Sequence, residues 1–483
     1  MYPVALYTLG CKLNQLESEA IADSFRKAGF PLVSSIDSAD PALIIINTCT
    51  VTSKADQKCR RLIRKALRDY PDSCVIVTGC YAHLDPAEIK LLEAEAGSGA
   101  HRLFVAGSNS IGTSGTSGTT GAASAGSAAA AGAAKSSLLD LPEYVRKAAN
   151  DTPKSPLSRI LESWVSSAAG SETFAFKPEE FLFHSRGYLK IQDGCDNSCS
   201  YCRVRLARGP SVSLPPEAAL AQVRSFEERD CAELMITGVN ITQYRYCGRD
   251  LAGLLEYLLE GSSSIAFRLS SLEPECIDQR LASALAHPRV RPHFHLSVQS
   301  GSDDVLRAMG RAYTSQAAGE GAALLRSVKD NPFLACDIIA GFPGETEAAF
   351  RQTLDLCAAI RFAWIHAFPY SKRPGTDAFS LNNPVCERDA AQRVQLLTKL
   401  AIQNRRDYAQ SWLGRELSAV VEKGRCSGGQ CRAVSENYLK LMVNCSGECS
   451  PGASIRCTPV SLCEKANGEE PDAIAVMGAY PCG

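Results

Sequence analysis

The sequence of 483 residues lacks three features that would each indicate a particular class of protein. It has no run of about 18 apolar residues, so no membrane-spanning helix and no membrane partner are expected. Residues 1–6, MYPVAL, are not a basic segment followed by an apolar run and a cleavage site, so they predict a first strand and a cytoplasmic protein. The formal net charge is only -1, so binding to nucleic acid would need a local basic patch.

Aromatic residues are also few, at 7%, whereas hydrophobic residues make up 45% and charged residues 21%. This balance is typical of a soluble globular protein, and the length predicts two to four domains. Cysteine, in contrast, is unusually frequent for a chain of this length, with 21 copies. Without a secretion signal, these cysteines are better explained as reduced thiols and metal ligands than as disulfides.

Three cysteines, Cys195, Cys199 and Cys202, fall within eight residues, directly after a predicted strand at residues 188–192. Three thiolates can hold three irons of a [4Fe–4S] cluster and leave the fourth iron open for chemistry. A zinc knuckle is the alternative. Zinc usually takes pairs of ligands from two turns, and no second Cys or His pair lies nearby in the sequence, so the spacing favours the cluster.

Residues 1–108 alternate apolar strands with helical patterns, which predicts a parallel sheet covered on both faces. The predicted strands are residues 4–8, 43–47, 75–79 and 103–106, and the predicted helices are residues 16–28, 55–69 and 86–94. Cys11, Cys49 and Cys80 each follow a strand. Parallel strands end at one edge of a sheet, so these thiols could meet there as ligands. The alternative is chance placement among many cysteines.

The predicted helix at 55–69 carries Arg61, Arg64, Lys65 and Arg68 on one face, at three- and four-residue spacing. This face could contact phosphates or could be an ordinary solvated surface, and the spacing alone favours neither.

Residues 109–137 are almost entirely Gly, Ala, Ser and Thr. Such a segment cannot bury enough apolar surface to offset the entropy of ordering it, so we predict a flexible insertion. Helical patterns at 138–149 and 157–165 then predict a longer linker that ends near residue 183.

From residue 188, strands and helices alternate six times, which predicts an open, partial TIM-like barrel. The predicted strands are residues 188–192, 233–237, 266–270, 293–299, 334–340 and 364–368, and the helices are 217–228, 251–259, 278–285, 319–328 and 346–360. Polar residues or glycines follow the strand ends. They share an edge with the three clustered cysteines, and this is the edge where such barrels build their sites.

Residues 387–412 predict one long amphipathic helix that closes the barrel. Short strands at 417–422, 438–443, 454–460 and 474–477 then predict an antiparallel barrel of about 65 residues. Seven cysteines fall between Cys426 and Cys482, but their spacing is loose and no histidine is near, so we expect no metal there.

Outside residues 109–183, the chain resembles the methylthiotransferases, a radical S-adenosylmethionine (SAM) family with three domains. The matching motifs are TLGCKLN at 8–14, NTCTVT at 47–52, TGCYA at 78–82, QDGC at 192–195, RLSSLEP at 268–274, LSVQSG at 296–301, DIIAGFPGET at 337–346 and FPYS at 368–371. Residues 10–14 and 49–56 are most similar to the branch that acts on threonylcarbamoyladenosine, next to the anticodon of tRNA on its 3′ side. Sister branches act on isopentenyladenosine in tRNA or on an aspartate of a ribosomal protein.

The resemblance implies a methylthiotransferase domain at 1–108, a radical SAM domain at 184–412 and a TRAM-like RNA-binding β-barrel at 413–483. It implies two [4Fe–4S] clusters, one on Cys195, Cys199 and Cys202, which binds SAM, and one on the cysteines at 11, 49 and 80. The first would generate a 5′-deoxyadenosyl radical and the second would carry the sulfur. Radical chemistry is needed because no side-chain acid or base can activate the C–H bond at carbon 2 of adenine.

The strand-end motifs and the resemblance also indicate further site residues, with none expected to be catalytic beyond the cluster ligands. The residues expected to contact SAM are Tyr201, Gly238, Asn240, Glu273, Gln299, Ser300, Asp337 and Phe368. Those expected to contact nucleic acid are Arg61, Arg64, Arg68 and Arg208. The implied partners are tRNA, an electron donor such as a flavodoxin or ferredoxin, and a sulfur donor that the motifs do not identify.

The chain departs from the family pattern in two places. Cys80 and Cys195 are farther apart than in the family, mainly because of the low-complexity segment. Residues 203–209 read RVRLARG, where the family commonly has apolar residues and a proline before ARG. The alternative function is that of a non-enzymatic nucleic-acid-binding protein, whose clusters are structural or redox-sensing. Under this alternative, every iron would have a protein ligand and the protein would not cleave SAM.

Overall fold

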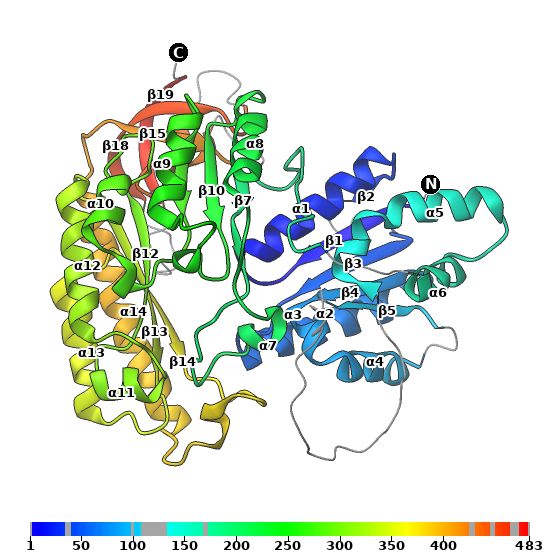
Figure 1. Cartoon of the computed structure of the whole chain (residues 1–483), viewed down its shortest axis with the longest axis horizontal. Coiled ribbons are helices and arrows are strands. Elements are labelled where there is room, and N and C mark those ends of the chain that lie inside the picture. Colours follow the sequence, from blue (N-terminus) through cyan, green and yellow to red (C-terminus); the bar gives the residue numbers. More distant parts are fainter. Residues whose placement is uncertain are drawn as a thin grey trace. The chain divides into compact units, whose positions relative to one another are not determined.

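A computed structural model of the chain describes residues 2–33, 40–97, 101–107, 133–167, 172–424, 430–444, 450–463 and 473–481. The chain divides into two compact units, whose elements Figure 1 shows. The N-terminal unit is Met1–Leu182 with Arg203–Pro210, and the C-terminal unit is Phe183–Cys202 with Ser211–Gly483. Among the described residues, no helix is long and apolar enough to cross a membrane.

The N-terminal unit contains a parallel sheet of six strands in the order β2-β1-β3-β4-β5-β6. Its strands are β1 (Val4–Thr8), β2 (Leu32–Val33), β3 (Leu43–Thr48), β4 (Cys74–Gly79), β5 (Leu103–Gly107) and β6 (Ala133–Ala134). The four predicted strands are confirmed to within one residue. The short strands β2 and β6 were not predicted. Every residue of β3 and β4 is buried, which explains their continuous apolar sequences.

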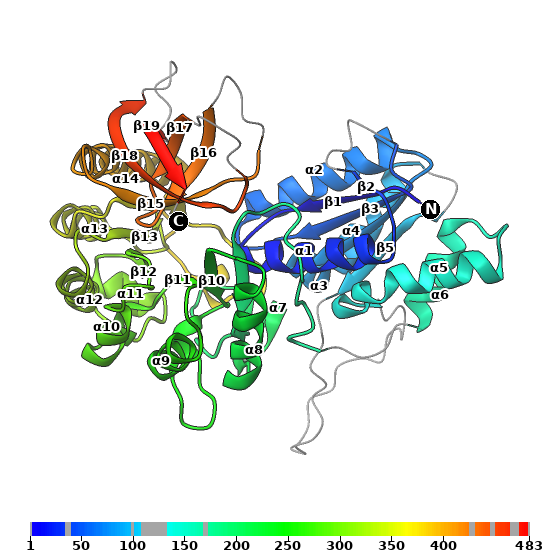
Figure 2. The same ribbon diagram turned by 90° about the horizontal axis from the view of Figure 1, so that it is seen from above.

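Helices cover both faces of this sheet. They are α1 (Lys12–Lys27), α2 (Ser53–Asp69), α3 (Cys80–Leu84), α4 (Pro86–Glu95), the 3₁₀ helix η2 (Lys135–Leu139), α5 (Leu141–Asp151) and α6 (Leu157–Ser167). Ile21 and Phe25 of α1 pack on one face, in a cluster with Ile76. Ile63 of α2 packs on the other, in a cluster with Val75. Figure 2 shows α1 and α2 on opposite sides of the sheet, as predicted.

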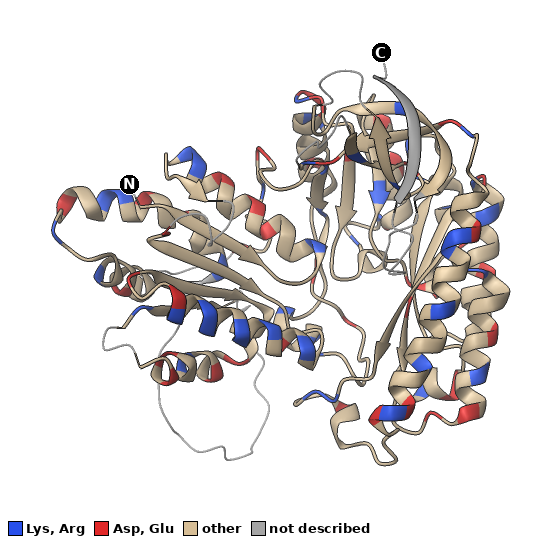
Figure 3. Ribbon diagram, turned by 180° about the vertical axis from the view of Figure 1, so that it is seen from behind, with Lys and Arg blue, Asp and Glu red and all other residues tan. Residues whose placement is uncertain are grey.

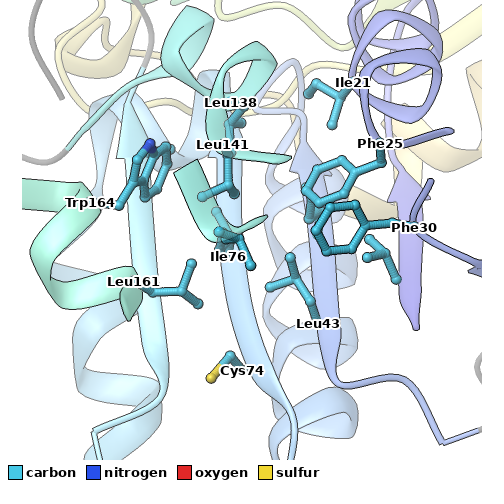
Figure 4. Packing of buried hydrophobic residues seen from close by; sticks show 14 of the residues in the cluster. Ile21, Phe25, Phe30, Leu43, Cys74, Ile76, Leu138, Leu141, Leu161 and Trp164 are labelled. Carbon is cyan, nitrogen blue, oxygen red and sulfur yellow. The ribbon is translucent and has the colours of Figure 1, made fainter. Parts of the chain in front are cut away.

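The predicted linker is wrong for the residues that follow the low-complexity segment. Leu138, Leu141, Leu161 and Trp164 are buried in the same hydrophobic core as Phe25 of α1 (Figure 4). The described chain resumes at β6, whose Ala-Ala sequence has the same composition as the residues before it. Composition therefore could not locate the boundary. Residues 108–132, which contain most of the predicted insertion, lie outside the described residues.

The C-terminal unit contains six parallel strands in the sequence order predicted for a partial barrel. They are β7 (Gly187–Lys190), β10 (Glu233–Thr237), β11 (Ala266–Leu269), β12 (His293–Gln299), β13 (Phe333–Ala340) and β14 (Trp364–Pro369). They form two three-stranded sheets, and single parallel bridges, Phe267 to Val290 and Leu272 to Leu296, connect β11 to the region of β12. The partial TIM-like barrel is thus confirmed.

Helices follow the strands of the partial barrel. They are α8 (Pro216–Glu227), α9 (Leu251–Gly261), α10 (Gln279–Leu285), α11 (Asp303–Ala308), α12 (Ser315–Val328), α13 (Glu347–Ile360) and α14 (Glu387–Gln410). The predicted strand at 188–192 is split, because Gln192–Asp193 forms a separate short strand, β8, paired with β9 (Val212–Ser213). This split places the cysteine loop directly after β8.

The last five strands form a closed barrel. They are β15 (Leu417–Val421), β16 (Gln430–Ser435), β17 (Lys440–Asn444), β18 (Ser454–Cys463) and β19 (Ala473–Pro481), in the order β15-β16-β17-β19-β18. The predicted small antiparallel barrel is confirmed, except that β17 and β19 pair in parallel. A closed barrel with an odd number of strands requires at least one parallel pair.

This small barrel shares its hydrophobic core with the partial barrel. Leu417 and Leu441 lie in one buried cluster with Phe333 of β13 and Tyr408 of α14. Cys431 of β16 is disulfide-bonded, so the expectation of reduced thiols is wrong at that residue. The cysteines at 426, 445, 449 and 482 lie outside the described residues.

Candidate active site: two groups of three cysteines

The loop with Cys195, Cys199 and Cys202 lies at the C-terminal edge of the partial barrel. A side chain that follows β10 holds its first half. The backbone N–H of Asp196 donates to Oε1 of Gln243 at 3.0 Å, and Nε2 of Gln243 donates to Oδ1 of Asn197 at 2.8 Å. Gln243 thus fixes the stretch between the first two cysteines.

The end of α11 holds the second half of the loop. The backbone N–H of Ser200 donates to the carbonyl of Met309 at 2.9 Å, and its hydroxyl donates to the carbonyl of Ala308 at 2.9 Å. Gly310 follows with a φ of +71°, and a Cβ there would lie 3.0 Å from the carbonyl oxygen of Ser198. This close approach and the positive φ both favour glycine.

Arg311, the next residue, faces the cysteines. Its Nη1 donates to Sγ of Cys199 at 3.1 Å, and its Nη2 forms an ion pair with Glu273. Both side chains are almost fully buried. The sequence prediction missed Arg311, because no motif surrounds it and it lies 112 residues from Cys199. A positive charge at this distance would stabilise the thiolate form of a cluster ligand.

Three of the residues expected to contact SAM lie close to this loop. Asn240 hydrogen-bonds to the thiol of Cys195, and its Nδ2 lies 3.4 Å from Oε1 of Glu273. Gly238 packs against Gln192, where a Cβ would lie 2.8 Å from Oε1. The structure therefore brings Gly238, Asn240 and Glu273 together at the cysteine edge.

The other residues expected to contact SAM have more varied surroundings. Tyr201 packs against the hydrophobic cluster of Met309 and Phe342. Ser300 is buried, and its Oγ lies 3.2 Å from Oγ1 of Thr353.

Three further expected contacts lie at or near the strand ends of β12, β13 and β14. Gln299 ends β12 with a φ of +61°. Asp337 has its Oδ2 3.0 Å from Nε2 of His295, and Phe368 is exposed with its ring parallel to that of His366.

The second group, Cys11, Cys49 and Cys80, is assembled from three strand ends of the N-terminal sheet. Cys11 caps α1, Cys49 follows β3, and Cys80 begins α3. Gly10, with a φ of +115°, fits closely against its neighbour, since a Cβ there would lie 3.0 Å from Sγ of Cys49. Burial, together with the proximity of Cys11 and Cys80, raises the pKa of the Cys49 thiol to about 12. The three strand ends thus converge as predicted.

Thiolates are ligands both for zinc and for iron–sulfur clusters. Across the described residues, no group of three His, Cys, Asp or Glu side chains is arranged to chelate one metal ion. A four-iron cluster holds its thiolates farther apart than a zinc ion does, because each binds a different iron. A buried thiol with a raised pKa ionises when a cationic metal centre binds it.

The residues expected to contact RNA divide into two groups. Arg61, Arg64 and Arg68 are exposed on α2, along which Figure 3 shows Lys and Arg recurring. Arg64 is 3.0 Å from Glu95 and Arg68 is 2.7 Å from Asp69, so neighbouring carboxylates partly neutralise this face.

Arg208 differs from the exposed arginines of α2. Its side chain is buried and ion-paired with Glu17 at 3.1 Å, which corrects its expected role as a phosphate contact. Sequence could not show this pairing, because the two residues are 191 positions apart.

Comparisons with known proteins give matches in both units of the chain. Residues 3–97 match the Uncharacterized protein family UPF0004, and residues 189–357 match the Radical SAM superfamily. A Treponema pallidum protein named threonylcarbamoyladenosine tRNA methylthiotransferase MtaB is 41% identical over 92% of this chain and 95% of its own length. A protein of the same name from Thermotoga maritima is 32% identical over 91% of each chain.

The chain belongs to the radical SAM methylthiotransferase family. Radical SAM methylthiotransferases are enzymes that use SAM and a [4Fe–4S] cluster. One similar solved structure is that of the radical SAM methyltransferase TsrM from Kitasatospora setae, with cobalamin and a [4Fe–4S] cluster bound. It is 14% identical to this chain, with a TM-score of 0.48. The match covers 78% of this chain and 77% of that chain.

Proposed function

We propose that this methylthiotransferase converts threonylcarbamoyladenosine, next to the anticodon of tRNA on its 3′ side, to the 2-methylthio derivative in the cytoplasm. The observation that carries the proposal is the 41% identity, over nearly the whole length, to a relative named for that substrate. Relatives named tRNA-2-methylthio-N(6)-dimethylallyladenosine synthase are 29% and 30% identical. The difference between 41% and these values favours threonylcarbamoyladenosine over isopentenyladenosine.

In this proposal the chain holds two [4Fe–4S] clusters. Cys195, Cys199 and Cys202 would ligate one, and the cysteines at 11, 49 and 80 would ligate the other. When bound, the clusters and SAM supply the radical and sulfur chemistry that carbon 2 requires. An electron donor such as a flavodoxin or ferredoxin would supply the electron.

The protein's own residues would bind and orient these groups. Arg311 keeps a positive charge against Cys199, and its pairing with Glu273 fixes that charge at the strand-end edge. The proposed contacts to SAM are Tyr201, Gly238, Asn240, Glu273, Gln299, Ser300, Asp337 and Phe368. The closed barrel β15–β19 is proposed to be a TRAM-like RNA-binding module, with the exposed face of α2 as a second contact.

Mass spectrometry of tRNA nucleosides from cells that lack the protein tests the substrate. We expect the 2-methylthio form of threonylcarbamoyladenosine to disappear and the unmodified nucleoside to accumulate. Loss of 2-methylthio-isopentenyladenosine instead would overturn the assignment, as would an unchanged nucleoside profile. Re-expression of the protein should restore the modification, whereas a Cys199→Ala variant should not.

Iron analysis of the anaerobically reconstituted protein tests the two clusters. Two clusters would give about eight irons per chain. Replacing Cys195, Cys199 and Cys202 with Ala should leave about four irons and abolish SAM cleavage. Replacing the cysteines at 11, 49 and 80 should also leave about four irons but should retain SAM cleavage. If either triple variant lost all its iron, the two-cluster proposal would be wrong.

A further inference from the structure

Lys135, the first residue of η2, is buried in the N-terminal unit although lysine is rarely buried without a partner. Its Nζ forms an ion pair with Glu17 of α1 and also donates to Oδ1 of Asn47 at 3.2 Å. Lys135 directly follows β6, near the end of the low-complexity segment 109–137. Lys135, next to the strand by which the chain rejoins the sheet, therefore introduces a buried positive charge.

Glu17 has a second buried cation as a partner. Nη1 of Arg208 lies 3.1 Å from Oε1 of Glu17, and Nη2 of Arg208 donates to Oδ1 of Asn14 at 3.2 Å. The side chains of Lys135, Glu17 and Arg208 are each at most 6% exposed. Two cations and one carboxylate leave this buried triad, Lys135–Glu17–Arg208, with one net positive charge.

Two asparagines connect the triad to the turns of Cys11 and Cys49. Nδ2 of Asn14 donates to the carbonyls of Leu9 at 2.8 Å and Thr48 at 2.9 Å, which lie just before those cysteines. Nδ2 of Asn47 donates to the carbonyl of Asn14 at 2.9 Å and to Oγ of Ser18 at 3.1 Å. The distance between these two strand ends therefore depends on side chains that the triad contacts.

The same contacts extend to the turn of Cys80. Oγ1 of Thr48 donates to the carbonyl of Thr78 at 2.5 Å, and it accepts from the backbone N–H of Ala82 at 3.2 Å. Gly79 leaves no space at this point, because a Cβ there would lie 2.6 Å from Oδ1 of Asn47. All three cysteine turns are thus linked, through Asn14, Asn47 and Thr48, to one buried charge group.

The charge of the triad also reaches the cysteines. Sγ of Cys11 lies 4.0 Å from Oδ1 of Asn14, the same oxygen that accepts from Nη2 of Arg208 at 3.2 Å. In a medium of low polarity, a nearby positive charge stabilises the anionic state of a metal centre, and it stabilises the more negative, reduced state most.

We propose that Lys135, Glu17 and Arg208 are positioning residues that fix the three cysteine turns and supply positive charge to the metal centre these cysteines hold. The inference rests on the proposed second cluster and assigns to it a set of supporting residues. The net charge of the triad sets the reduction potential of that cluster. Removal of a cation lowers the potential, and removal of the carboxylate raises it.

The test uses the full chain with the substitutions C195A, C199A and C202A, so that only the cluster of the N-terminal unit remains. In this parent protein, Lys135→Met should speed the removal of iron by a chelator roughly 10- to 100-fold. It should also shift the reduction midpoint, measured by spectroscopic titration, to a more negative value. Lys135→Arg, which keeps the charge, should leave the midpoint near that of the parent. Lys147→Met, an exposed lysine of α5, should change neither quantity.

Glu17→Gln separates an electrostatic role from a merely structural one. Both Glu17→Gln and Lys135→Met disturb the same contacts, but they change the net charge in opposite directions, so their midpoints should shift in opposite directions. If the midpoints of the two variants shift in the same direction, or equal that of the parent, the inference is wrong. This holds even if the variants lose iron faster than the parent. If the parent protein binds no iron, both the proposed second cluster and this inference are wrong. If the parent binds iron but the variants have the same iron-removal rate and midpoint as the parent, only this inference is wrong.

Discussion

Each unit of this protein buries a carboxylate against several cations, but the two carboxylates lie at opposite ends of their sheets. Glu17 lies beside the C-terminal strand ends that carry three cysteines. Glu233 is the first residue of β10, at the N-terminal end of the partial barrel. Nε of Arg268 lies 2.7 Å from Glu233 and Nε of Arg291 lies 3.0 Å from it, and both Glu233 and Arg268 are fully buried.

The difference between the two carboxylates shows how position decides what a buried charge group does. Nη2 of Arg268 also donates to the carbonyl of Ser435 in β16 at 3.1 Å, so Glu233 helps to hold the small barrel on the partial barrel. In parallel α/β folds the C-terminal strand ends build the site, whereas the N-terminal ends contribute to stability. We therefore expect changes at Glu233 to affect folding, and changes at Glu17 to affect the proposed metal site.

The largest expected effect comes from Glu233→Gln. This change leaves Arg268 buried without its counter-charge, so the free energy of unfolding should fall by about 3–5 kcal/mol. Urea unfolding under anaerobic conditions measures it. Glu256→Gln, at an exposed carboxylate 3.8 Å from Arg280, is the matched control and should change stability by less than about 0.5 kcal/mol. Equal stability of the two variants would contradict the role assigned to Glu233.

The pH dependence of stability gives a second, somewhat smaller effect. Burial alone would raise the pKa of Glu233, but Arg268, with Arg291 and Arg186, lowers it to about 2. The unfolded carboxyl has a pKa of about 4.3. The resulting stabilisation, at most about 3 kcal/mol, is fully present above that value and is lost as pH falls toward 2.

Glu233→Gln removes this titration. The difference in free energy of unfolding between the unsubstituted protein and Glu233→Gln should therefore shrink as the pH falls from about 4.5 to 3. Urea unfolding of the metal-free proteins measures it. A difference that stays constant over this range would mean that Glu233 titrates as it does in the unfolded chain.

Two deletions should produce a smaller effect in the N-terminal unit. Deleting residues 112–137 removes Lys135 together with β6, so Glu17 loses a buried cationic partner and the unit should lose about 2 kcal/mol. Deleting residues 112–127 spares both features and should cost less than about 0.5 kcal/mol. Thermal unfolding of the two variants makes the comparison. Similar losses would show that Lys135 has no special part in stability.

Sequence predicted the features that depend on local spacing and regular alternation. The cysteine loop at 195–202 is one turn, so its spacing was informative, and the two α/β regions were clear from their apolar strands. Arg311 and Lys135 could not be found in this way. Arg311 reaches Cys199 across 112 residues, and Lys135 reaches Glu17 across 118. Composition hid Lys135 as well, because the alanines and serines around it resemble the segment before it.

The smallest effect on stability is expected on the exposed face of α2, where charge reversal should leave the fold intact and change only RNA binding. Arg61 has no ion pair within the part of the chain that the structure describes, whereas Arg64 and Arg68 contact Glu95 and Asp69. The three substitutions Arg61→Glu, Arg64→Glu and Arg68→Glu should therefore differ in their effect on tRNA binding.

If α2 contacts tRNA, each lost phosphate contact lowers the slope of log affinity against log salt by about one. Arg61→Glu should give this full decrease, and Arg64→Glu a smaller one, because Glu95 already neutralises part of its charge. The slopes are measured from tRNA binding at several salt concentrations. Equal slopes for all three variants and the unsubstituted protein would show that this face is an ordinary solvated surface.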